Sequence, residues 1–244
     1  YIVTKDLGSY TFDKAKNTFV YEEELAFEQT DATDYQKTNG FNGVLDGQGH
    51  TLKFKLTKGG LVGLVLGNAV IKNLGVLYED ATSTYYGAFG YVTNGNPEIR
   101  NCYIERTNNH YQAYSVFGIM ARPNTKLIMH NTVVYGYNTS NNSAKYGNMW
   151  INETSTNVYV IHARKNAMDW VNVQGFTKVF TDAIENGSRE VLLSEIEDVS
   201  KFNDEYWYKQ DGKLVWKGLG FVTVTWVANE TEVSKSYTVD SKLE

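Results

Sequence analysis

The sequence has only one cysteine, Cys102, in 244 residues, which excludes a disulfide framework within the chain. It lacks any run of lysines and arginines, and its formal net charge at pH 7 is −5, so we do not expect nucleic acid as a partner. No apolar stretch approaches the roughly 18–20 residues that a membrane-spanning helix needs, so we expect no direct insertion into a membrane. It also lacks a signal-peptide pattern and begins at Tyr1 instead of methionine, which leads us to expect a piece of a longer protein.

Clusters of chemically active residues are also scarce. Four histidines occur, without the spacing of metal ligands: His50, His110, His130 and His162. Glycoside hydrolysis needs two carboxylates about 5–9.5 Å apart on one face, and no pattern fixes such a pair. The acidic candidates are Glu79, Asp80, Glu98 and Glu105. We therefore expect no metal, no cofactor and no catalytic residue, and an enzyme is the less favoured alternative.

What the sequence does contain is a repeat. Four segments begin with asparagine and end on a β-branched residue: 73–76, 101–104, 131–134 and 157–160. Their asparagines lie 28, 30 and 26 residues apart. A second apolar element precedes each of the first three segments, at 60–65, 87–92 and 115–120. Two short apolar strands in each repeat of about 20–50 residues, with turn residues between them, predict a β-solenoid.

We therefore predict an all-β fold, a right-handed parallel β-helix in which equivalent strands stack about 4.8 Å apart. Residues 1–40 are expected to form an N-terminal cap and first coil, 41–217 the parallel β-helix with its capping segment, and 218–244 a linker and a partial β-module. In the stretch 51–56 polar and apolar residues alternate, which places Leu52, Phe54 and Leu56 on the inner face of a strand.

The C-terminal part of the helix carries an aromatic hairpin signal. The aromatic stretches 206–208 and 214–216 flank Asp211-Gly212, a favoured turn sequence for a β-hairpin. We expect this aromatic hairpin to cover the exposed end of the last coil. The stretch 221–227 then alternates strictly, and we expect it to be a single stub strand of the following module.

The stretch 41–52, FNGVLDGQGHTL, followed by GLVGLV at 60–65 and IKNL at 71–74, resembles the GLUG-motif proteins, large surface proteins of Gram-positive and gut bacteria. The ending with Phe202, Trp207 and Trp216 is similar to the close of such regions. This resemblance covers roughly residues 41–217 and implies a right-handed parallel β-helix. The tail from Phe221 resembles the opening of an internalin B-repeat module. Such neighbours imply a multi-domain secreted or wall-attached protein, of a kind often assigned to adhesion.

Two columns of residues follow from stacking the repeats. The asparagines Asn73, Asn101, Asn131 and Asn157 are expected to form a structural ladder, in which side-chain amides hydrogen-bond to each other at a turn. Immediately before the first three lie Lys72, Arg100 and His130, which would form a row of basic groups. That row could receive an acidic glycan chain, and the alternative is a solvated edge of the turn.

Tyrosines are the other candidate contact groups. Tyr78, Tyr103 and Tyr135 belong to a set that we place mostly at or near loops, where exposed rings would contact sugars or proteins. The alternative is that these rings are packed under loops. Cys102 aligns with Leu74, Thr132 and Val158, so a core role is favoured over a nucleophile.

We therefore expect a non-enzymatic, extracellular or cell-surface module of a bacterial surface protein. It would act in adhesion, bind a ligand such as a polysaccharide or a host or cell-surface protein, or serve as a stalk beside neighbouring β-modules of the same longer chain. The alternative is a polysaccharide lyase, or a phage depolymerase or tail-fibre domain, on the same scaffold.

Overall fold

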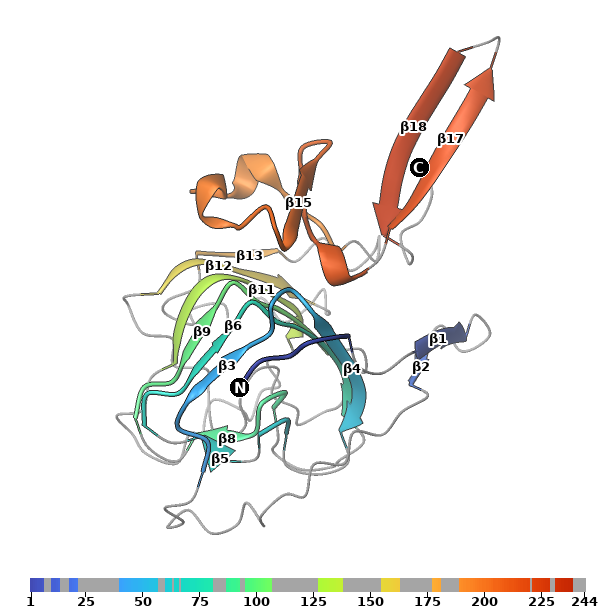
Figure 1. Ribbon diagram of the computed structural model, residues 1–244. Helices are drawn as coiled ribbons and strands as arrows, with labels where there is room; N and C mark the ends of the chain where they lie inside the picture. The colour runs from blue at the N-terminus through green and yellow to red at the C-terminus, as the bar shows by residue number, and fades with distance from the viewer. Residues whose placement is uncertain are drawn as a thin grey trace.

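The computed structural model describes residues 1–6, 10–13, 18–21, 40–56, 60–62, 64–65, 67–80, 87–92, 95–106, 127–137, 155–162, 177–180, 189–219, 221–228 and 231–238. Within these ranges every regular element is a β-strand or a short 3₁₀-helix, which confirms the all-β prediction. Half of the strands in these ranges belong to one parallel sheet that curls into a half-barrel (Figure 1).

The large sheet has two arms that meet in β11 (Ile128–Tyr137). The first arm consists of β3 (Val44–Asp46), β6 (Val70–Lys72), β9 (Glu98–Arg100) and the beginning of β11. The second arm consists of β4 (Thr51–Leu56), β7 (Gly75–Asp80), β10 (Tyr103–Arg106), the later part of β11, β12 (Thr156–His162) and β13 (Lys178–Phe180). A separate parallel pair is formed by β5 (Leu64–Val65) and β8 (Tyr91–Val92). Every one of these pairs is parallel, so successive repeats lie side by side.

A corner with an asparagine joins the two arms within each repeat. Asn73, Asn101, Asn131 and Asn157 all have a positive φ, between 50° and 54°. Asparagine tolerates this left-handed conformation better than other residues that carry a Cβ atom. The chain can therefore change direction between the arms without breaking the parallel pairing on either side.

The inside of the curl holds one hydrophobic core. Leu52 and Phe54 of β4 are buried in it, which confirms the predicted alternation at these two positions, and the side chain of Leu56 lies outside the described residues. In the first arm the middle residue of each short strand points inward, so that Ile71 and Ile99 are fully buried. Side chains from both arms thus meet in one cluster, which fixes the curl of the sheet.

Residues 189–219 form a segment that we call the strap. It contains β14 (Val191–Leu192), β15 (Trp207–Gln210) and β16 (Lys213–Trp216), together with the 3₁₀-helices η3 (Leu193–Glu195), η4 (Val199–Lys201) and η5 (Lys217–Leu219). β15 and β16 pair in antiparallel fashion, and Asp211 and Gly212 in the turn have φ values of 50° and 74°. The predicted aromatic hairpin is therefore confirmed.

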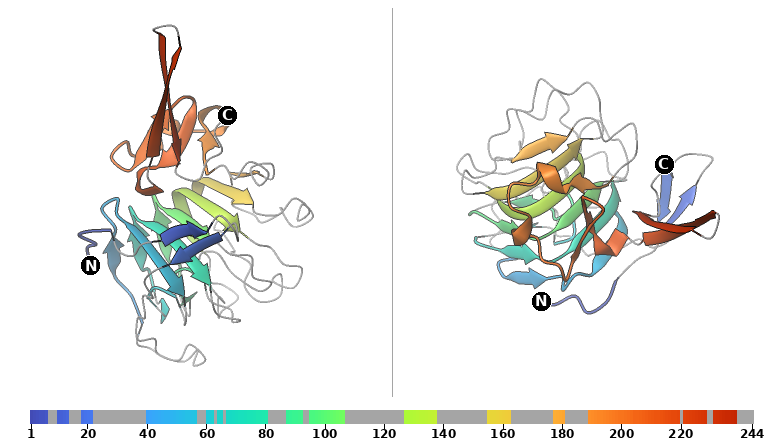
Figure 2. Two further views of the ribbon diagram at one scale, coloured as in Figure 1. Left: turned by 90° about the vertical axis from the view of Figure 1, so that its right-hand side faces the viewer. Right: turned by 90° about the horizontal axis from the view of Figure 1, so that it is seen from above.

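Its predicted place is wrong, because the strap lies across the outer face of the second arm and not over the end of the last coil (Figure 2). Trp216 contacts β4 through Thr51, whereas Phe202 packs against Tyr159 of β12 with ring centroids 6.1 Å apart. The physical reason is that outward-facing positions of the second arm, such as Leu77 and Val133, are apolar and need burial.

Both ends of the chain form further strand pairings. At the N-terminal side, Ile2 bridges Asp46 in parallel, so residues before β3 extend the first arm. β1 (Tyr10–Asp13) and β2 (Thr18–Tyr21) form an antiparallel pair of their own. The prediction of a single stub strand in the tail is wrong, because β17 (Phe221–Ala228) pairs with a second strand, β18 (Thr231–Thr238), in a hairpin. The mostly polar sequence of β18 gave no apolar alternation from which to predict it.

Candidate functional site

Side-chain hydrogen bonds join the asparagines of the column in two pairs. Nδ2 of Asn101 donates to Oδ1 of Asn73 at 3.0 Å, and Nδ2 of Asn157 donates to Oδ1 of Asn131 at 3.1 Å. Nδ2 of Asn73 donates to Oδ1 of Asp46 at 3.0 Å. The amides of the column are thus used in joining successive repeats, which is a structural role.

The basic row is aligned in register on the outer side of the first arm. Lys72 lies opposite Arg100, Arg100 opposite His130, and His130 opposite Thr156. The preceding residues Ile71 and Met129 are buried, so the row faces outward. The alignment that the asparagine repeat implied is therefore present in the structure.

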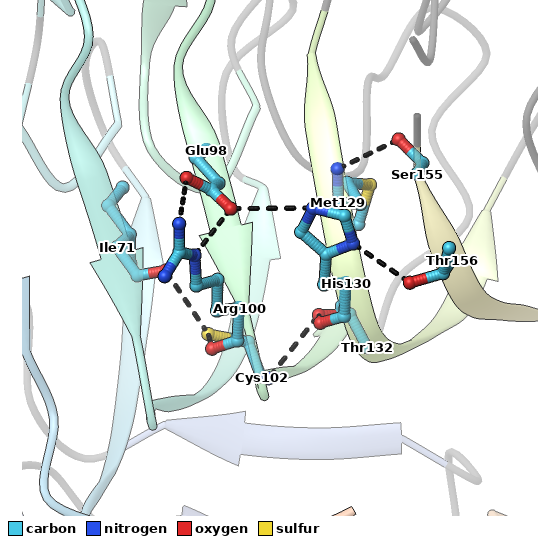
Figure 3. A network of polar contacts seen from close by, with 9 residues as sticks. All are labelled: Ile71, Glu98, Arg100, Cys102, Met129, His130, Thr132, Ser155 and Thr156. Atoms are coloured by element: carbon cyan, nitrogen blue, oxygen red, sulfur yellow. Dashed lines mark hydrogen bonds and ion pairs between the residues drawn. The ribbon is translucent and has the colours of Figure 1, made fainter. Parts of the chain in front are cut away.

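Each basic group of the row has a partner, and Figure 3 shows those of Arg100 and His130. Nζ of Lys72 lies 3.0 Å from Oδ2 of Asp46. Glu98 lies between the other two groups: it accepts hydrogen bonds from Nε and Nη2 of Arg100, the latter at 2.6 Å, and its Oε1 lies 3.5 Å from Nε2 of His130. On its other side, Nδ1 of His130 lies 2.9 Å from Oγ1 of Thr156. Arg100, Glu98, His130 and Thr156 therefore form one polar network, and Lys72 forms a separate pair with Asp46.

The electrostatics of the row follow from these pairs. The two carboxylates, Asp46 and Glu98, balance the two cations, Lys72 and Arg100, so the row carries no net charge when His130 is neutral. Burial raises the pKa of Asp46, but the hydrogen bonds from Asn73 and Lys72 outweigh this and the pKa is lowered from its ordinary value. The hydrogen bonds to Glu98 raise the pKa of Arg100. The positive and negative charges of the row thus balance, so the row offers little net attraction to an acidic glycan.

The candidate tyrosines lie elsewhere than predicted. Tyr78 and Tyr103 have no exposed surface, because Tyr78 points into the core and Tyr103 lies beneath the strap. Tyr135 in β11 is partly buried against the strap, and its ring lies under the guanidinium of Arg189. Their placement at loops is thus corrected: all three belong to strands, where Tyr78 faces the core and Tyr103 and Tyr135 face the strap.

The candidate carboxylates do not all lie on one arm of the sheet. Glu98 belongs to the row on the first arm, Glu79 and Asp80 end β7, and Glu105 in β10 is fully buried. Glu98 and Glu105 each form an ion pair with an arginine.

Cys102 is also buried, and burial raises the pKa of its thiol to about 12, so it is not poised as a nucleophile.

The pairing of Glu105 with Arg189 was not predicted from the sequence. Nε of Arg189 lies 2.9 and 2.8 Å from the two carboxylate oxygens, and the hydroxyl of Tyr103 donates to Oε2 at 2.6 Å. Burial lowers the pKa of Arg189, but the charge of Glu105 outweighs it and the pKa is well above its usual value. Burial and the same carboxylate raise the pKa of Tyr103 well above its usual range.

We also did not predict from the sequence the sockets of the strap, which are the glycine positions that make room for its aromatic rings. A Cβ atom at Gly75 would lie 2.4 Å from Nε1 of Trp216, and one at Gly49 would lie 2.4 Å from Cδ1 of Tyr206. Trp207 donates from Nε1 to Oδ1 of Asn101 at 2.7 Å. The sequence did carry one signal, since the run 76–78 is apolar on both faces of the strand, which is typical of a strand covered on both sides.

In the parts of the chain that the structure describes, no group of three or more histidine, cysteine, aspartate or glutamate side chains could hold a metal ion. Of the candidate histidines, His50 lies 3.2 Å from Asp6, the side chain of His162 is not described, and His110 lies outside the described residues. None of the helices in the described ranges is long and apolar enough to cross a membrane.

No family model matches the sequence, and comparisons with curated proteins and with solved structures give no match.

Proposed function

We propose that the chain is a right-handed parallel β-helix that serves as a rigid, non-enzymatic module of an extracellular bacterial surface protein. Two features support the fold. Successive repeats supply parallel strands to both arms of the sheet, and a third parallel pair, β5 with β8, follows the second arm in sequence. The similar φ values of the asparagine corners indicate one backbone path repeated from coil to coil.

The observation that carries the functional proposal is that the candidate ligand groups are already engaged. Lys72 and Arg100 are paired with carboxylates, and Tyr78 and Tyr103 are buried. Glu105, a candidate acid or base, is held by an arginine. A surface of this kind favours the role of a stalk over that of an acidic-glycan receptor or an enzyme.

The strap supports the same role. Its contacts extend from Thr51 in β4 to Tyr159 in β12, so a single segment joins repeats that are far apart in the stack. A solenoid without such a segment is held only by contacts between neighbouring repeats. Joining distant coils makes the stack stiffer, which suits a module that holds neighbouring β-modules of a longer chain at a fixed distance.

The rival enzymatic role has a direct test. The intact chain would be incubated with a panel of acidic polysaccharides while the ultraviolet absorbance of unsaturated products and the formation of reducing ends are followed. We expect no turnover in either assay. Turnover would overturn the proposal in favour of a lyase or depolymerase, and a trimeric mass by light scattering would favour a tail-fibre component.

Binding of an acidic glycan at the row is tested separately on a glycan array. We expect no acidic glycan to be retained, because the charges of the row are balanced. An acidic hit that disappears in the double variant Lys72→Glu with Arg100→Glu would make the row a receptor site and overturn the stalk. The control is Lys201→Glu, which changes an exposed charge of the strap that is not part of the row.

A further inference from the structure

The surroundings of Glu105 have the form of a receptor for a guanidinium group. Arg189 contacts the carboxylate through two of its nitrogens: Nε reaches both oxygens, and Nη2 lies 2.7 Å from Oε1. The side chain of Glu105 is fully buried and that of Arg189 is 8% exposed. A planar fork facing a carboxylate is a geometry that guanidinium satisfies and ammonium does not.

The rest of the receptor comes from the sheet. The hydroxyl of Tyr103 donates to Oε2 of Glu105 at 2.6 Å and fixes the orientation of the carboxylate. The ring of Tyr135 lies 5.1 Å from Cζ of Arg189, within the distance of a cation–π contact. The carboxylate, the hydroxyl and this ring therefore belong to β10 and β11, whereas the strap supplies the cation.

We propose that the sheet carries an arginine-recognition site, formed by Tyr103, Glu105 and Tyr135, which this chain fills with Arg189 of its own strap. Because receptor and ligand belong to different segments, the pair of Glu105 and Arg189 holds the strap on the second arm. We call this pair the latch. An alkylguanidinium, or an arginine side chain of another molecule, fits the same site when Arg189 is absent. This inference does not depend on the stalk role proposed above.

The strap has further anchors besides the pair of Arg189 with Glu105. Trp216 donates to Thr51, and Trp207 donates to Asn101. Trp207 and Trp216 also pack edge to face, with ring centroids 5.1 Å apart. Removing the Arg189 side chain therefore vacates the site while these tryptophans keep the strap on the sheet.

The test uses the intact chain with Arg189→Ala, titrated calorimetrically with ethylguanidinium, and with ethylammonium as a control of equal charge. We expect saturable binding of ethylguanidinium that is at least about tenfold tighter than that of ethylammonium, because only the fork reaches both oxygens. The unmodified chain, whose site is filled, should bind neither cation, and adding Glu105→Gln to the variant should abolish binding. Equal binding of the two cations, or binding no tighter than in the unmodified chain, would overturn the proposal.

A second measurement covers the case in which Arg189→Ala does not fold by itself. The variant would be refolded in the presence of each cation and examined by circular dichroism and tryptophan fluorescence. Recovery with ethylguanidinium and not with ethylammonium supports the recognition site. Recovery with both cations, or with neither, contradicts it.

Discussion

The indole Nε1 of Trp216 donates a 3.0 Å hydrogen bond to Oγ1 of Thr51, although the two residues are 165 positions apart in the sequence. The indole lies between Gly75 and Gly218, where added Cβ atoms would come within 2.4 and 2.6 Å of Nε1. The strap is thus held at a site formed by β4, β7 and the C-terminal end of the strap itself. Close approach of the ring to the backbone requires glycine at both positions.

The tryptophan socket predicts that Gly75→Ala destabilises the protein. The new methyl group would force the Trp216 indole away from β7, which we expect to lower the free energy of unfolding by about 1–3 kcal/mol. Urea denaturation followed by tryptophan fluorescence measures the change. The control is Gly43→Ala, whose Cβ atom would come no closer than 3.8 Å to Phe41. Equal stabilities of the two variants would show that the socket is not tight.

The latch predicts strong coupling between Glu105 and Arg189. Each of Glu105→Gln and Arg189→Met removes one partner of a buried ion pair, and we expect each to cost about 3–5 kcal/mol. The double variant should be more stable than the sum of the two changes implies, by about 0.5–3 kcal/mol. Thermal and urea denaturation of all four proteins give the coupling energy. The control Asp204→Asn removes an exposed carboxylate that pairs with Lys209, and it should cost about 0–1 kcal/mol.

The asparagine corner predicts different costs for two substitutions at Asn73. Asn73→Ala leaves a Cβ atom in the left-handed region and should destabilise the chain by about 1–2 kcal/mol beyond the lost hydrogen bonds. Asn73→Gly loses the same hydrogen bonds but accepts the φ of 54° without strain. The glycine variant should therefore be the more stable of the two in urea denaturation. A reversed order would mean that the backbone at this corner relaxes.

The lowered pKa of Asp46 predicts a loss of stability in acid. Its ordinary value is 3.8, and the pKa is lower in the folded state, because hydrogen bonds from Asn73 and Lys72 outweigh the effect of burial. A group with a lowered pKa contributes stability above its unfolded pKa and loses it as the pH falls through the folded value. Asp46→Asn should therefore flatten the decline of the melting temperature below about pH 4. Parallel declines in the variant and the unmodified chain would contradict this.

The burial of Cys102 predicts that its thiol is inert in the folded protein. With a pKa of about 12, almost no thiolate exists at neutral pH, and solvent does not reach the sulfur. A chromogenic disulfide reagent should give no colour with the native chain and one equivalent after denaturation in guanidinium chloride. Rapid reaction of the native chain would mean that this corner opens readily.

Local patterns were sufficient for the regular part of the fold. The asparagine spacing predicted which residues align, and Lys72, Arg100 and His130 lie in register as the repeat implies. Alternation predicted the buried side of β4, and Asp211-Gly212 predicted the hairpin of β15 and β16. These features depend on neighbours within a few residues, or on a constant spacing between repeats, and both can be read directly from the sequence.

What the tertiary structure decided is which groups remain available at the surface. The sequence does not show that Arg189 meets Glu105, 84 positions earlier, or that Glu98 lies between Arg100 and His130. The sequence also left open whether Tyr103 faces water or the strap. A strand has an inner and an outer face, and the sequence pattern does not show which segment covers the outer face. A contact that occurs only once between two distant segments does not recur at a fixed spacing, so no repeat in the sequence reveals it. Such contacts depend on where the strap packs, and that is set by the apolar positions on the outer face of the second arm.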